Sequence, residues 1–156
     1  VECYILEGKL PQPQQACAEM QERAGAFVSL KKHGELRGCI GTFEPTQASV
    51  AKEIMANAIS SATRDPRFLP VTAEELPYLE YSVDLLTPPQ PIENKEQLDA
   101  KRFGVIVESQ GRRGLLLPDI EGVDTVDQQI EICCQKAGIR PGEPVKLYCF
   151  QVRRFK

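Results

Sequence analysis

The sequence has no long apolar run and only one histidine, His33, among its 156 residues. No stretch approaches the roughly 20 apolar residues that a membrane-spanning helix needs, and no signal-peptide pattern opens the chain. We therefore expect no membrane partner and predict a cytoplasmic location. One histidine and no Cys-x-x-Cys pair leave few ligands for structural zinc, so we expect neither a metal nor another cofactor.

The chain also lacks a dominant charge. Its 19 basic and 22 acidic residues give a net charge of −3, which provides no general attraction to nucleic acid or anionic membranes. The basic pairs Arg112-Arg113 and Arg153-Arg154 are weak evidence for RNA, so an RNA-binding domain is the least favoured function. The six cysteines are dispersed over a chain too large to need disulfide bonds, and we expect all of them to be reduced: Cys3, Cys17, Cys39, Cys133, Cys134 and Cys149.

Periodicity and turn residues predict an α+β fold with a mainly antiparallel β-sheet flanked by helices. A Pro/Gln-rich linker at 10–15 precedes a short helix over 14–24, with Ala16, Met20 and Ala24 on one stripe. Strands are predicted at 26–32, 36–43, 79–86, 103–109, 114–118 and 144–155, and helices at 47–64 and from 124 to 138. The first residues resemble the end of a helix and Val1 replaces a starting Met, so we expect a single domain over 1–156, taken from a longer chain.

The segment 35–45, ELRGCIGTFEP, is unusual because Cys39 stands close to two glycines in a strand pattern. Glycine weakens a strand interior, so Gly38 and Gly41 suggest that room is needed there. A three-residue loop at 33–35 pairs Ser29 with Cys39, Lys31 with Arg37 and Phe27 with Gly41. It places Val28, Leu30, Leu36 and Ile40 on the other face, and predicts that these four are more buried than Lys31 and Arg37.

Two interpretations of Cys39 follow from this register. Lys31 and Arg37 lie within one pair of the thiol, and such cations favour a nucleophilic or redox-active thiolate. Alternatively, Cys39 is a small buried hydrophobic residue. His33 is roughly 10 Å away along the strand, at about 3.3 Å per residue, which is beyond hydrogen-bond reach. A Cys–His dyad within this chain is therefore not expected.

A second unusual segment is TRDPRFLPV at 63–71. Asp65 before Pro66 is typical of a turn that ends a helix. However, Asp65, Arg67 and Phe68 would also be suitable recognition groups if this turn approached the hairpin. We predict that the turn lies close to Cys39, with Asp65 as the acid–base candidate.

Five blocks of the sequence resemble the AMMECR family, also called AmmeMemoRadiSam system protein A. They are GAFVSLKKHGELRGCIGTFEP (25–45), DPRFLPV (65–71), EYSVDLLTPP (80–89), GLLLPDIEGVDTV (114–126) and QKAGI (135–139). The resemblance implies an α+β fold with a smaller second subdomain. It also implies a Memo-like protein, related to extradiol dioxygenases, and a radical SAM protein as partners, and fusion to a Memo-like domain would account for the missing Met. It implies no established reaction.

Our leading hypothesis is an enzyme component or accessory subunit that acts with these partners on an unknown small-molecule or peptide substrate. The candidate catalytic residues are Cys39, Arg37 and Asp65, and the candidate binding residues are Gly38, Gly41, Thr42, Lys31, Arg67 and Phe68. The alternative is a non-catalytic module in which Gly38 and Gly41 let a peptide or nucleotide approach the backbone. Fold alone does not distinguish the two.

Overall fold

A computed structural model describes residues 1–11 and 18–156 and divides the chain into two compact units. Unit 1 comprises Val1–Leu86 and Arg153–Lys156, and unit 2 comprises Thr87–Val152. Each unit contains one four-stranded sheet, and every strand pairing reported below is antiparallel. The predicted α+β class is confirmed. Residues 12–17, which include Cys17 and Ala16, lie outside the described residues.

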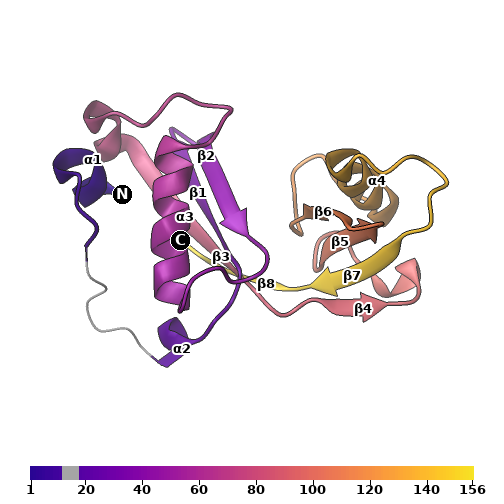
Figure 1. Cartoon of the computed structure of the whole chain (residues 1–156). Helices are drawn as coiled ribbons and strands as arrows, with labels where there is room; N and C mark the ends of the chain where they lie inside the picture. Colours follow the sequence, from indigo (N-terminus) through magenta and orange to yellow (C-terminus); the bar gives the residue numbers. More distant parts are fainter. Residues whose placement is uncertain (12–17) are drawn as a thin grey trace. The chain divides into compact units, whose positions relative to one another are not determined.

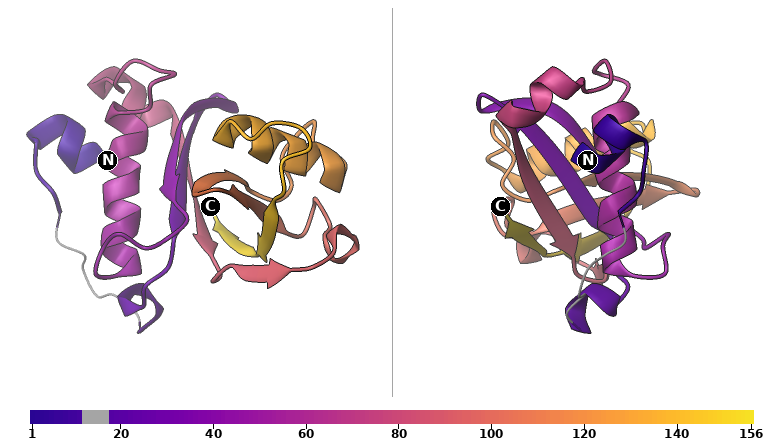
Figure 2. Two further views of the ribbon diagram at one scale, coloured as in Figure 1. Left: turned by 45° about the vertical axis from the view of Figure 1, so that its right-hand side comes forward. Right: turned by 90° about the vertical axis from the view of Figure 1, so that its left-hand side faces the viewer.

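Unit 1 is built on a sheet of order β2-β1-β3-β8 with α3 along one face (Figures 1 and 2). Its buried core contains Val28, Leu30, Ala62, Val71 and Leu76. The predicted short helix is shorter among the described residues, but Met20 and Ala24 pack against a second apolar cluster as expected. The elements are α1 (Glu2–Glu7), α2 (Ala18–Gln21), β1 (Ala26–Lys32), β2 (Glu35–Thr42), α3 (Val50–Thr63), η1 (Ala73–Tyr78), β3 (Leu79–Leu86) and β8 (Val152–Phe155).

Unit 2 has the sheet order β4-β7-β5-β6, and α4 packs on β5 and β6. Helix α4 begins after a capping box of Thr125 and Gln128 and ends at Gly138, whose φ of 65° is left-handed, as its sequence predicts. Val126, Ile130 and Ala137 of this helix pack on the core of unit 2. The elements are β4 (Gln90–Ile92), η2 (Lys95–Gln97), β5 (Gly104–Ser109), β6 (Arg112–Leu116), α4 (Val126–Ala137) and β7 (Lys146–Phe150).

The hairpin of β1 and β2 confirms one part of the predicted register and corrects another. Ser29 pairs with Cys39 and Phe27 with Gly41, as predicted. However, the connection is a two-residue turn of His33 and Gly34, with φ of 53° and 81°, and the register shifts between Leu30 and Lys31. A β-bulge at this point leaves one extra residue in β2 and restores the predicted sorting of faces beyond it.

The bulge changes the side chains nearest the turn. Lys31 pairs with Leu36, and not with Arg37 as predicted. Leu36 is 42% exposed, whereas the Arg37 side chain is only 16% exposed, so the predicted order of burial is wrong for this pair. The reason is that Arg37 is the extra residue, and a bulge redirects the side chain at its position.

The described part of the chain contains no helix with the length and apolar character needed to cross a membrane. The five cysteines in it are free thiols: Cys3, Cys39, Cys133, Cys134 and Cys149. The prediction of six reduced cysteines remains a prediction for Cys17, which lies outside the described residues.

Candidate functional site

A row of buried polar side chains runs along α3 toward the hairpin. Glu53, Asn57 and Ser61 follow one another at intervals of four residues, and Asp65 continues the interval beyond the helix end. All four are buried, with relative exposures of 1, 5, 1 and 3%. We call these four residues the polar ladder. Sequence reasoning concentrated on the apolar stripe of α3 and missed this second, polar stripe, although its four-residue interval is visible in the sequence.

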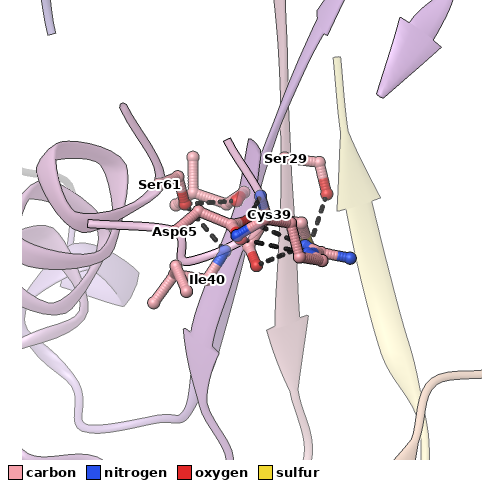
Figure 3. A network of polar contacts seen from close by, with 7 residues as sticks. Ser29, Cys39, Ile40, Ser61 and Asp65 are labelled. Atoms are coloured by element: carbon pink, nitrogen blue, oxygen red, sulfur yellow. Dashed lines mark hydrogen bonds and ion pairs between the residues drawn. The ribbon is translucent and has the colours of Figure 1, made fainter. Parts of the chain in front are cut away.

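The ladder bonds to both strands of the hairpin. Asn57 donates through Nδ2 to the Ala26 carbonyl (2.9 Å) and to Thr42 Oγ1 (3.2 Å), and Thr42 donates to Glu53 Oε1 (2.6 Å). The Ser61 hydroxyl donates to the Val28 carbonyl (2.7 Å) and accepts from the Ile40 N–H (2.8 Å; Figure 3). Because Val28 and Ile40 are register partners, one hydroxyl bridges the two strands.

Glu53 is a buried carboxylate bonded by neutral donors. Besides Thr42, it accepts from the Thr46 N–H (2.8 Å), the Thr46 hydroxyl (2.9 Å) and the Gln47 N–H (2.6 Å). Burial raises the pKa of Glu53, but these hydrogen bonds outweigh it, and the pKa lies below its ordinary value. The ionised side chain thereby fastens the loop after β2 to α3.

The turn after α3 forms hydrogen bonds with the outer edge of β2 at Cys39. Strand β2 is the outermost strand of its sheet, and Asp65 Oδ2 accepts the Cys39 N–H at 2.9 Å. Arg67 donates hydrogen bonds to the same carboxylate through Nε (3.0 Å) and Nη2 (2.7 Å), and Nη2 also donates to the Cys39 carbonyl at 3.3 Å. The predicted proximity of this turn to Cys39 is confirmed (Figure 3). Asp65 and Arg67 occupy the main-chain groups that an added strand would use.

Arg67 and the Cys39 N–H favour the ionised form of Asp65. The hydrogen bonds from Arg67 hold its pKa far below its ordinary value, burial opposes this shift, and the Cys39 N–H reinforces it. The contacts of Asp65 are those of a positioning residue. Its predicted acid–base role stays a prediction.

Cys39 is half-buried and lies opposite Ser29, as the register predicted. The Ser29 hydroxyl contacts Cys39 Sγ at 3.2 Å. The room expected beside the thiol is filled, because a side chain at Gly41 would meet the Phe27 ring at 2.2 Å. Gly38 is also enclosed, with the Ser61 carbonyl 2.2 Å from where its Cβ would stand. Both glycines thus permit close packing within the unit.

Arg37 turns toward Glu75 on η1. Its Nε and Nη2 atoms contact the two Glu75 oxygens at 2.9 and 2.8 Å, and Lys32 Nζ reaches Oε1 at 3.0 Å. The hydrogen bonds from Arg37 lower the pKa of Glu75 to about 2, with burial acting in the opposite direction. The charge of Arg37 is therefore compensated by Glu75. Glu75 was not selected as a site residue from the sequence. Glu75 also forms a capping box with Thr72 at the start of η1.

The turn at 66–70 presents a large apolar side chain outward. Both ends are held by main-chain bonds, from Phe68 to Asp65 (3.1 Å) and from Val71 to Ala62 (2.8 Å). The Phe68 ring lies 5.9 Å from the Arg37 guanidinium carbon and 5.4 Å from that of Arg67, within cation–π range. Leu69, the next residue, is 83% exposed.

Two further candidates have other neighbours. Thr42 hydrogen-bonds with Glu53 and Asn57, and the exposed Lys31 is the register partner of Glu80 on β3. The ring centroids of His33 and Tyr78 are 5.2 Å apart. Two open hollows, of about 380 and 300 Å³, are lined only by unit 2 residues. Within the part of the chain that the structure describes, no three His, Cys, Asp or Glu side chains form a group able to hold a metal ion.

Comparisons with known proteins place this geometry in a family. The AMMECR1 family model matches residues 1–155. A Thermotoga maritima protein is 50% identical over 160 residues, covering all of this chain and 92% of that protein. A Clostridium acetobutylicum protein is 46% identical over 92% of this chain, which spans only 31% of its length.

The fold has a close counterpart among solved structures. The crystal structure of uncharacterized protein PH0010 from Pyrococcus horikoshii superposes with a TM-score of 0.88 at 34% identity, covering 98% of this chain and 83% of the other. The resemblance seen in the five sequence blocks thus extends over the whole fold. The chain belongs to the AMMECR1 family.

Proposed function

We propose that this chain is an accessory, protein-binding component of a modification pathway with a Memo-like protein and a radical SAM protein, and that it binds through the 66–70 turn. The observation that carries the proposal is the 83% exposure of Leu69 on a turn anchored at both ends. A large apolar side chain held in one position gains contact area on binding and loses little conformational freedom.

The composition of the turn supports this role. Arg67 and Phe68 stand beside Leu69, and arginine and aromatic residues are enriched where interfaces concentrate their binding energy. The Arg67 side chain is half-exposed although it grips Asp65, so its outer edge is accessible to a partner. Pro66 and Pro70 flank the turn and restrict its backbone.

The surroundings of Cys39 favour binding over catalysis. A cysteine nucleophile in acyl transfer needs a base and amide donors for the developing oxyanion. His33 lies at the hairpin tip beside Tyr78, Arg37 is paired with Glu75, and the Cys39 N–H is held by Asp65. Ser61 and Phe27 pack where side chains at Gly38 and Gly41 would stand, which supports a packing role for both glycines.

A second candidate function is thiol chemistry at Cys39, favoured by the contact of 3.2 Å with the Ser29 hydroxyl. A hydroxyl that donates to sulfur stabilises the thiolate form. Under this hypothesis, Ser29→Ala slows alkylation of Cys39 by iodoacetamide, and Ser82→Ala, at the register partner of Ser29 on β3, leaves it unchanged. Equal rates in wild type and both variants would reject it.

The binding proposal is tested with the purified Memo-like and radical SAM proteins of the same organism. We expect at least one to bind by isothermal titration calorimetry, and Leu69→Ser to weaken binding at least tenfold. Leu6→Ser is the matched control, because Leu6 is a leucine of the same unit with 64% exposure. Absence of binding to both proteins would overturn the accessory role, whereas binding unaffected by Leu69→Ser would place the contact elsewhere.

A further inference from the structure

Strand β2 has an unusual attachment for an outermost strand. With one strand neighbour, half of its main-chain polar groups need partners other than β1. Asp65 and Arg67 supply those partners at Cys39, on the outer edge. Ser61 and Asn57 act on the inner edge, where each contacts both strands. The helix and the turn therefore hold β2 from two sides.

The burial of the ladder makes these bonds interdependent. Each of Glu53, Asn57, Ser61 and Asp65 is at most 5% exposed, so a bond that breaks there is not replaced by water. A buried polar group left without a partner costs about 1–3 kcal/mol. Separating the turn from β2 leaves the Cys39 N–H unpaired and removes one hydrogen bond from Asp65, and separating α3 from the hairpin breaks the bonds of Ser61 to Ile40 and Val28 together.

Close packing reinforces the connection at its centre. Gly38 lies directly against the main chain of Ser61, where a side chain would stand 2.2 Å from the Ser61 carbonyl oxygen. The Ser61 hydroxyl reaches Ile40, two residues further along the strand, and Asp65 reaches Cys39 between them. Three consecutive residues of β2 are thus placed by residues 61–65.

We infer that the polar ladder is a coupling device, in which the 66–70 turn and strand β2 open and close as one unit. Ser61 and Asp65 are its positioning residues. Only one part of the inference, the use of the turn in binding, rests on the proposed function. A partner that fixes the turn would then also fix the segment around Cys39, and a change in β2 would reach the turn.

Amide hydrogen exchange of the isolated full chain tests the coupling without any partner. In Ser61→Ala we expect four amides to exchange about 10- to 100-fold faster than in the wild type. They are those of Cys39 and Ile40 in β2, of Phe68 in the turn and of Val71 directly after the turn. The matched control is Ser60→Ala, because the neighbouring Ser60 side chain is outside the ladder. Val83 in β3 reports global opening of unit 1 and should change little in either variant.

Asp65→Asn perturbs the polar ladder at its other end. It also provides the test of the coupling if Ser61→Ala does not fold. It should accelerate exchange at Ile40, which Asp65 does not contact, as well as at Cys39. Acceleration at Ile40 and Cys39 without any at Phe68 and Val71 in Ser61→Ala would overturn the coupling. So would equal effects in Ser60→Ala, or acceleration of Val83 by the same factor. None of these outcomes depends on whether a pathway protein binds.

Discussion

Replacing Glu75 with glutamine removes one charge from η1 and preserves the shape of the side chain. The Glu75 carboxylate accepts hydrogen bonds from Arg37 and Lys32. It also caps η1 by accepting the Thr72 N–H at 3.1 Å. Glutamine can perform the capping role, so Glu75→Gln isolates the effect of the charge. The variant leaves the Arg37 guanidinium, only 16% exposed, without a compensating anion.

The size of the loss follows from the pKa of Glu75, which is about 2 in the folded chain against an ordinary 4.5. At about 1.4 kcal/mol per pH unit, this difference corresponds to at most about 3.5 kcal/mol. The Lys32 side chain is 34% exposed, so solvent screens its contribution to this stabilisation. We therefore expect Glu75→Gln to lower the free energy of unfolding at pH 7 by about 1–3 kcal/mol.

The pH dependence provides the sharper test. Because the folded pKa is depressed, the stabilisation is complete above the ordinary value of 4.5 and is lost as the pH falls from there toward about 2. The difference between wild type and Glu75→Gln should shrink by about 1.4 kcal/mol for each pH unit in that window. Urea unfolding followed by tyrosine fluorescence measures it, since three of the four tyrosines belong to unit 1.

Glu74→Gln is the control, because Glu74 is the exposed neighbour of Glu75 in η1. It should change stability far less. If the two variants lose the same amount at pH 7, or if the loss in Glu75→Gln stays constant down to pH 3, the argument that Glu75 anchors Arg37 and Lys32 is refuted.

Gly38→Ala should lower the unfolding free energy by about 1–3 kcal/mol, and by more than Gly41→Ala, because a methyl group at Gly38 meets the rigid Ser61 main chain and one at Gly41 meets a movable ring. Denaturant titration of both variants checks the order, and the reverse order would contradict it. Thr42→Val removes the bonds to Glu53 and Asn57 and should cost about 1–3 kcal/mol, whereas Thr63→Val, which loses a bond only to its own helix, should cost less. Mass-spectrometric alkylation kinetics should show Cys39 labelling unchanged by Arg37→Ala, because Glu75 already engages that cation, and a clear slowing would restore the thiolate interpretation. Cys133 should label most slowly near neutral pH, because burial raises its pKa to about 12.

The local elements of this protein were predictable from the sequence. The period-two alternation of the sequence in β1 and β3 and the capping residues of α4 specify local structure, because they depend on backbone geometry within a few residues. The pairing of Ser29 with Cys39 also followed from sorting apolar residues onto one face. The five blocks shared with the family carried the assignment of the fold.

The bonding partners within the site were decided only by the tertiary structure. Arg37 was expected beside Cys39, and it turned to Glu75, 38 residues further along the chain, because a bulge redirected it. Asp65 was predicted as an acid–base candidate, and the folded chain pairs it with Arg67 and the Cys39 N–H. Periodicity specifies which face a side chain occupies, but not which distant group reaches that face. The bonds between α3, the turn and the hairpin arise when residues 11 to 33 positions apart pack together, and so only the folded chain shows them.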